Sequence, residues 1–317
     1  MSTVSETTHG SAVAMSAPPS PDDGLPAAEL AKKYGLAVSG ARPSLPDYAR
    51  QLWARRHFII AFSRAKLTAQ YSQAKLGQVW QVATPLLNAT VYFLIFGVLM
   101  GQSKGMGIAT YIPFLVTGIF VFTFTQSSAM SGVRSIAGNL GLVRALHFPR
   151  AALPISFALQ QLQQLLFSML VLFLFLLGFG HTPQLSWLLI VPTLALQFVF
   201  NTGLAMVLAR AGSKTPDLAQ LLPFILRTWM YASGVMYNLV EALEKQHAPK
   251  WLIDVLSANP AAVFINLMRS SLISGHAAHK HIDLPPHVWA LAVGWALLIG
   301  VGGFVYFWKA EEQYGRG

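Results

Sequence analysis

The chain has 317 residues, of which 54% are hydrophobic and 11% are charged, and its mean hydropathy is +0.50. Soluble globular domains carry charge at about a quarter of their positions, so this composition excludes an ordinary soluble domain and is typical of a chain whose solvent is largely lipid. Cysteine is absent, which excludes disulfides, thiolate metal sites and cysteine nucleophiles. The formal net charge of +10 has to be located along the chain before it indicates a partner.

Residues 1–46 are rich in Ser, Thr, Ala and Pro, and they lack the basic start and apolar core of a signal peptide. Because such a composition offers little apolar surface to bury, we predict a disordered tail. The stretch AAELAKKYGL within it could form a short helix.

Residues 47–75 are too charged to cross a membrane and are expected to form one interfacial amphipathic helix. Its apolar residues at helical spacing are Tyr48, Leu52, Ile59 and Phe62. The residues expected at the headgroup layer are Arg50, Trp53, Arg55 and Arg56. Two roles are open for this helix, either a simple topology anchor or a part in gating substrate.

Six apolar segments are long enough to cross about 30 Å of hydrocarbon at about 1.5 Å per residue. They lie at approximately 79–100, 110–130, 153–178, 186–209, 218–238 and 288–308. Together they define a transmembrane domain over residues 76–310, followed by a short tail at 311–317. The fifth segment is the weakest because it contains Arg227.

Lys and Arg gather on one side of these segments, which indicates the cytoplasmic side. That side carries Arg50, Arg55, Arg56, Arg64, Lys66, Lys75, Arg134, Arg144, Arg150, Arg210, Lys214, Lys309 and Arg316. We therefore predict a multi-pass protein of the plasma membrane with both termini in the cytoplasm. The basic charge is a topology signal, so a nucleic-acid partner is not expected.

The sequence contains no Asp or Glu between Asp47 and Asp217. Carriers driven by protons or sodium usually place carboxylates in their spans, so the driving force is expected to come from elsewhere. No G-x-x-x-x-G-K-[ST] loop is present to bind nucleotide phosphates. A transporter of this composition needs a separate subunit that hydrolyses nucleotide.

Arg227 would lie about ten residues into the fifth span, where an arginine is costly unless it faces the bundle interior or a wet cavity. It could bind the diphosphate of a lipid-linked substrate, or it could be a structural arginine bonded to carbonyls. Aromatic residues could also line a path for sugar rings, although most should face lipid or the core. The candidates for the substrate path are Arg227, Trp229, Tyr231, Tyr92 and Phe96.

Three further patterns indicate no additional chemistry. The histidines of the outer stretch HAAHKHIDLPPH, His276, His279, His281 and His287, fit no standard metal spacing and predict a solvated loop. No arrangement of side chains indicates a catalytic site. Gly97 and Gly101 have G-x-x-x-G spacing, which is weak support for dimerisation.

The order of several stretches resembles the permease subunit of type-2 ABC exporters for polysaccharides, the group that moves teichoic acid, O-antigen, capsule or galactan precursors. The matching stretches are AQYSQAKLGQVWQVATPLLNATVYFLIFG, GNLGLVRALHFPRAALPIS, KTPDLAQLLPFILRTWMYASGVMY and ANPAAVFINLMRSSL. The resemblance covers most of residues 48 to 310. The long N-terminal tail departs from it.

The resemblance implies an all-α integral membrane protein with a cytoplasmic coupling helix between spans two and three and re-entrant helices between spans five and six. Pro149 should end any helix before Phe148. The residues implied to form or border the ATPase contact are Asn139, Leu140, Arg144, His147, Phe148, Pro149 and Arg150. Without the resemblance, the alternative for this stretch is an ordinary basic loop on the cytoplasmic side. Other positions that match family motifs are Leu76, Gly77, Trp80, Asp217, Asn259, Pro260 and Arg269.

The resemblance further implies a homodimer that binds separate nucleotide-binding subunits, which carry ATP and Mg²⁺, so that this chain itself holds no cofactor. The expected cargo is a lipid-linked glycan or polyol phosphate, with teichoic acid as the first choice, and membrane lipids surround the dimer. The alternatives are a type-2 exporter of drugs or small lipids, and a membrane enzyme or scaffold that transports nothing.

Overall fold

The computed structural model of the chain describes residues 26, 29–30, 33–34, 43–72, 74–101, 106–146, 148–273, 282 and 284–314. The chain divides into two compact units, residues 1–41 and 42–317. In the first unit the amide of Tyr34 donates to the carbonyl of Leu30 at 3.0 Å, which is a helical turn inside the predicted short helix. Most of the predicted disordered tail lies outside the described residues.

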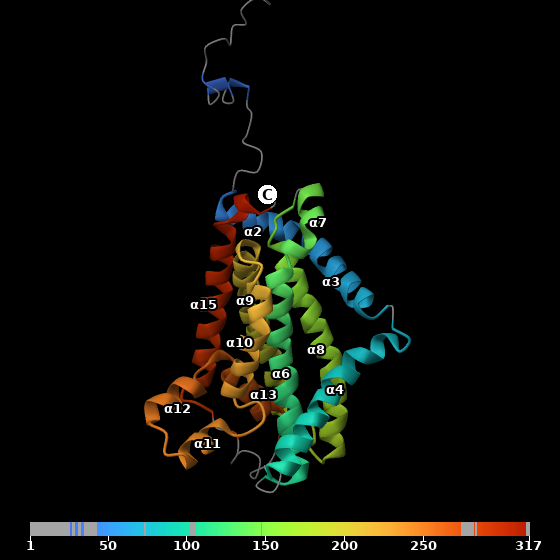
Figure 1. Cartoon of the computed structure of the whole chain (residues 1–317), viewed down its shortest axis with the longest axis vertical. Helices are drawn as coiled ribbons and strands as arrows, with labels where there is room; N and C mark the ends of the chain where they lie inside the picture. Colours follow the sequence, from blue (N-terminus) through green and yellow to red (C-terminus); the bar gives the residue numbers. More distant parts are fainter. Residues whose placement is uncertain are drawn as a thin grey trace, which may run out of the picture. The chain divides into compact units, whose positions relative to one another are not determined.

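The described residues of the second unit form helices joined by turns and loops, with no strand among them (Figure 1). Five of its helices are long and apolar enough to cross a membrane. They are Trp80–Leu99, which joins α4 (Trp80–Tyr92) to a π-helical turn, α6 (Ile108–Arg134), α8 (Ala152–Gly178), Leu185–Lys214, which contains α9 (Ile190–Lys214), and α15 (Val288–Trp308). They correspond to the predicted spans one to four and six.

The predicted fifth span is shorter than expected. Its helix, α10 (Leu218–Ala232), has 15 residues, or about 22 Å at about 1.5 Å per residue, which does not cross about 30 Å of hydrocarbon. The chain turns at Gly234, whose φ is +63°, a conformation that glycine adopts without strain. It continues through α11 (Leu239–Lys245) on the far side of that turn.

The region between α11 and α15 contains a bent helix pair. α12 (Lys250–Ser257) and α13 (Pro260–Leu272) are bent by 73° at the break between them, and they reach the length of a sixth candidate span only if they are counted together. The break has a local cause, because Asn259 caps α13 by accepting from the amide of Ala262 at 3.1 Å and Pro260 begins the new helix.

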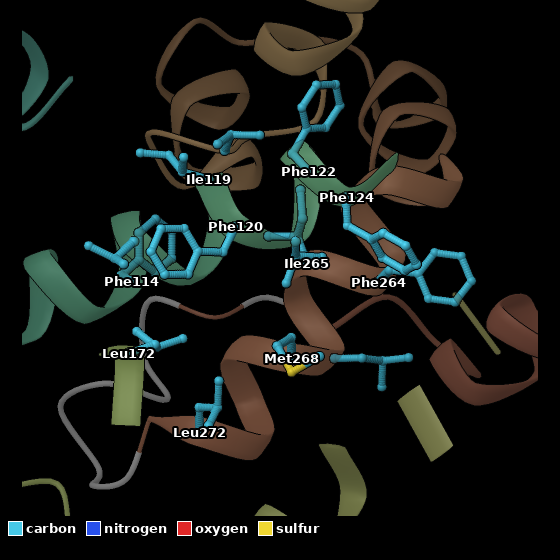
Figure 2. Packing of buried hydrophobic residues seen from close by; sticks show 14 of the residues in the cluster. Phe114, Ile119, Phe120, Phe122, Phe124, Leu172, Phe264, Ile265, Met268 and Leu272 are labelled. Carbon is cyan, nitrogen blue, oxygen red and sulfur yellow. The ribbon is translucent and has the colours of Figure 1, made fainter. Parts of the chain in front are cut away.

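α6 is the centre of the bundle, where it contacts α4, α8, α9, α10 and α13. Within the most apolar 18-residue stretch of α6, 72% of the residues are buried, compared with 17% for the corresponding stretch of Trp80–Leu99. Figure 2 shows how its aromatic side chains meet the apolar face of α13. The buried core cluster to which both helices contribute includes Phe114, Phe120, Phe122, Phe124, Phe264, Ile265, Met268 and Leu272.

α9 and α15 approach each other at backbone distance because both carry glycine at the contact. A Cβ added to Gly203 would lie 2.0 Å from the carbonyl oxygen of Ile299, and one added to Gly303 would lie 2.4 Å from the carbonyl oxygen of Gly203. Small residues of this kind allow tight packing between membrane helices. By contrast, the Gly97 of the G-x-x-x-G pair contacts Tyr111 within the same chain, so it gives no support to dimerisation.

The predicted single interfacial helix is two helices, α2 (Leu45–Ala54) and α3 (Arg56–Tyr71), with the break at Arg55. Ser44 caps α2 by accepting from the amide of Asp47. The predicted inward stripe is confirmed at Tyr48 and Ile59, which are buried. α3 packs along α8, and the hydrogen bonds between them join Ser63 to Gln163, Gln70 to Gln160 and Tyr71 to Gln164.

Candidate functional site

The end of the bundle that carries α2, α7 (Leu140–Ala145) and the C-terminal segment is called the basic end here (Figure 1). α7 and the residue after it present exposed side chains, with Leu140 at 36% and Leu146 at 50% exposure and Arg144 also exposed. The helix ends at Ala145, which confirms that it stops before Phe148. His147, a predicted coupling residue, lies outside the described residues.

The chain turns inward after α7 and forms what we call the Glu311 network, which comprises Tyr48, Arg150, Ala151 and Glu311. The amide of Arg150 donates to Glu311 Oε1 at 2.9 Å, and its guanidinium donates to the Glu311 backbone carbonyl. The Tyr48 hydroxyl donates to Glu311 Oε2 at 2.7 Å and accepts from the amide of Ala151 at 3.1 Å. The network therefore joins three parts of the chain, namely helix α2, the loop after α7 and the segment that follows α15.

Glu311 is 8% exposed, and this burial raises the pKa of its carboxyl above the ordinary value, because the charged form loses hydration. The hydrogen bonds from Arg150 and Tyr48 act in the opposite direction and hold the pKa down. The predicted tail at 311–317 thus begins with a buried residue. Tyr314, three residues later, is also buried, and its ring stacks on Phe307 at a centroid distance of 4.5 Å.

The described coupling residues differ in their exposure. Leu140 and Arg144 are exposed at the basic end, as expected of a docking surface. Pro149 is buried and Arg150 is half-buried in the Glu311 network, so these two lie at the border of the exposed surface. Asn139 and Phe148 are half-buried as well. Asn139 donates to the Ser135 carbonyl at 2.9 Å, and the Phe148 ring lies 5.3 Å from that of Phe58.

A polar groove of about 660 Å³ lies between α3, α4, α6 and α8. Two cations, Lys66 and Arg134, line it together with amide and hydroxyl side chains, and no Asp or Glu is among its lining residues. It reaches Gly138 and Asn139, directly before α7. The other polar lining residues are Gln70, Tyr71, Thr84, Asn88, Thr123, Gln126, Ser127, Ser131, Gln161 and Gln164.

The sequence interpretation missed this groove, although a signal for it exists. The stretches FTFTQSS in the second span and QQLQQ in the third place amides and hydroxyls in segments that are otherwise apolar. Polar residues at bilayer depth are costly and usually serve a function or a helix contact. Helical spacing alone did not indicate that both stretches face one cavity.

Three of the predicted substrate-path residues lie near one another. Tyr92 on α4 is close enough to Arg227 and Tyr231 on α10 for electrostatic interaction. Arg227 is exposed, and so is Tyr231 at 41%. Trp229 points elsewhere, since its Nε1 donates to Asn259 Oδ1 at 3.2 Å. Phe96 is partly buried against the main core.

The structural arginine bonded to carbonyls is Arg269 and not Arg227. Arg269 is 1% exposed and donates to the carbonyls of Phe114 at 3.1 Å, Gly234 at 3.0 Å and Val235 at 2.6 Å. Its guanidinium also lies 3.4 Å from the centroid of the Phe114 ring. Arg227 makes no hydrogen bond to a carbonyl within the described part of the chain. Arg269 thus ties α13 to α6 and to the turn after α10.

The residues predicted to lie at the headgroup layer are exposed. Among the predicted interfacial residues, Trp53 is 72% exposed, and the Arg56 guanidinium lies 5.6 Å from its ring centroid. Arg50 and Arg55 are exposed as well.

Of the histidine run only His287 is among the described residues, which contain no group of three potential metal ligands.

Comparisons with known proteins agree with this architecture. Residues 57–273 match the ABC-2 type transporter family. The chain is 27% identical over 227 residues to the O-antigen export system permease protein RfbA of Klebsiella pneumoniae, which covers 71% of this chain and 84% of the relative. It is 24% identical over 266 residues to the protein of the same name from Myxococcus xanthus, covering 83% and 96%. It is 22% identical over 214 residues to the polysialic acid transport protein KpsM of Escherichia coli, covering 67% and 79%. With a family match over more than half of its length, and with several helices able to span a membrane, this chain is a multi-pass membrane protein that belongs to the ABC-2 type transporter family.

Proposed function

We propose that this chain is the membrane-spanning half of an ATP-driven exporter that moves a lipid-linked polysaccharide or polyol phosphate out of the cytoplasm. The observation that carries the proposal is the polar groove, free of carboxylates, in a chain related to permeases named for O-antigen and polysialic acid. Hydroxyl-rich polymers need amide and hydroxyl partners. Teichoic acid-type, O-antigen-type and galactan polymers all belong to this chemical class.

The basic end is the cytoplasmic side in this proposal, with both chain termini in the cytoplasm and the bundle in the plasma membrane. A separate ATPase subunit, which binds ATP and Mg²⁺, docks on α7 and the residue that follows it, where Leu140, Arg144 and Leu146 are exposed. A displacement of the loop after α7 would reach α2 and the segment after α15 together, because the Glu311 network joins all three. This chain itself performs no bond chemistry.

A homodimer is supported by the surface around α4 and α10. Trp80–Leu99 is the least buried of the candidate spans, and Arg227 is exposed on α10 beside it. An arginine in contact with hydrocarbon costs several kcal/mol unless it meets water or a polar partner. A second copy placed against this surface would enclose Arg227, Tyr92 and Tyr231 in a shared path and remove them from lipid.

The proposed docking surface can be tested by co-purification. The full chain in nanodiscs is incubated with the ATPase subunit of an ABC polysaccharide exporter, and the amount of ATPase retained is measured. We expect retention by the native chain, loss with Arg144→Glu, and no loss with Arg64→Glu, a matched charge reversal at an exposed position of α3. A correctly inserted chain that retains no ATPase, or equal loss with both variants, would contradict the proposed function.

A further inference from the structure

The polar groove has an electrostatic character that identifies the part of the cargo it can hold. Lys66 and Arg134 line it, and neither has a carboxylate partner within the described part of the chain. The hydrogen-bond partner of Lys66 is Asn139 Oδ1, at 3.5 Å. Two cations in a cavity without carboxylates favour an anion, and phosphate oxygens accept hydrogen bonds from both cation types.

The remainder of the lining suits the hydroxyls of a saccharide. Thr123, Gln126 and Ser127 come from α6, and Asn88 comes from α4, so donors and acceptors surround the cavity on more than one wall. The Phe157 ring, which also lines the groove, lies 5.7 Å from Lys66 Nζ and offers an apolar surface beside the cation. The volume of about 660 Å³ lies within the range of about 300–1,000 Å³ that is typical of small-molecule sites.

The position of the groove indicates how such a ligand would be oriented. The two cations lie with Gly138 and Asn139 directly before α7, while Thr84, Asn88 and Thr123 line the wall formed by the spans. In Figure 1, α3 and α4 lie on the same side of the bundle, and both contact α8. A lipid-linked saccharide would therefore place its phosphate at the basic end and its first sugar between α4 and α6.

From these observations we propose that the groove between α3, α4, α6 and α8 binds the phosphate-bearing end of a lipid-linked saccharide, with Lys66 and Arg134 at the phosphate and Asn88 and Gln126 at the first sugar. This assignment rests on the proposed export function. It also gives the coupling loop a direct contact with the cargo site, since the bond between Lys66 and Asn139 connects the cation to the turn before α7.

The test is equilibrium binding to the full chain in nanodiscs, measured by native mass spectrometry with three probes. The probes are a polyprenyl diphosphate carrying N-acetylglucosamine, the same polyprenyl diphosphate without sugar, and phosphatidylglycerol. We expect the sugar-bearing probe to bind about tenfold more tightly than the bare diphosphate, because its hydroxyls find partners in the groove. Phosphatidylglycerol should bind more weakly than both.

Variants separate the two parts of the site. The double change Lys66→Gln and Arg134→Gln should weaken both diphosphate probes by about tenfold or more, because two charge-assisted contacts are lost. Gln126→Leu should weaken only the sugar-bearing probe. Lys66→Arg, which keeps the charge, should retain binding, and Arg64→Gln on α3 outside the groove is the control for nonspecific charge effects.

Three results would overturn the assignment: no effect of the double change, equal binding of phosphatidylglycerol and the sugar-bearing probe, or an Arg64→Gln effect equal to that of the double change. Retention of the ATPase subunit is measured on the same preparations. If the probes bind as expected while no ATPase is retained, the groove assignment stands and the exporter function fails. If the ATPase is retained and the groove variants leave the binding of all probes unaffected, the exporter function stands and the groove assignment fails.

Discussion

Replacing Arg269 with methionine should strongly destabilise the fold. The change leaves the loop carbonyls of Gly234 and Val235 without the donors that now lie at 3.0 Å and 2.6 Å. A buried polar group left unsatisfied costs about 1–3 kcal/mol, which gives roughly 2–6 kcal/mol for two such carbonyls. Removing a buried guanidinium also relieves its desolvation, which offsets part of this loss. We therefore expect a net loss of about 2–4 kcal/mol.

Thermal unfolding of the detergent-solubilised chain, followed by tryptophan fluorescence, measures this effect. At about 2–4 °C for each kcal/mol in a domain of this size, Tm should fall by about 5–15 °C. Arg64→Met is the matched control, because Arg64 is exposed on α3 and surface substitutions usually change stability by about 0.5 kcal/mol or less. Arg269→Lys should lie between the two, since one ammonium cannot reproduce the planar fork. Equal Tm values for the Arg269→Met and Arg64→Met variants would refute the reasoning.

Two further predictions concern neighbouring contacts. Gly118→Ala should lower Tm, because the added Cβ would lie 2.5 Å from the Arg269 guanidinium and 2.7 Å from the Val235 carbonyl oxygen. Gly294→Ala should leave Tm unchanged, because the space around its Cβ is open. Equal Tm values for the two variants would contradict this steric argument. Glu311 has a raised pKa in the folded state, so its contribution to stability is complete below its ordinary pKa of about 4.3 and is lost as the pH rises through the folded value. Tyr48→Phe removes a donor that lowers the pKa of Glu311. Tm should therefore be lower overall, and the fall of Tm with rising pH should continue to a higher pH than in the native chain. A plot of Tm against pH that runs parallel to that of the native chain would contradict the role of the Tyr48 hydroxyl.

The sequence by itself determined the membrane character of the chain and most of its spans. Span one was predicted at 79–100 and is observed at Trp80–Leu99, and span six was predicted at 288–308 and is observed at Val288–Trp308. These features are local, because hydropathy is a sum over consecutive residues and the length of the apolar run sets the length of the helix. The end of α7 before Phe148 is local too, since Pro149 restricts the residue that precedes it.

Only the tertiary structure decided which polar residues serve which purpose. Arg227 and Arg269 both lie in apolar helices, and hydropathy cannot distinguish them. Arg269 is the structural one because its acceptors come from Phe114, 155 positions away, and from the turn at Gly234, 35 positions away. The same holds for Glu311, whose partner Tyr48 lies 263 positions earlier, and for the polar groove, whose walls come from four helices. A buried charge or amide is stable only with its partners in place, and those partners are neighbours in space that the order of residues does not reveal.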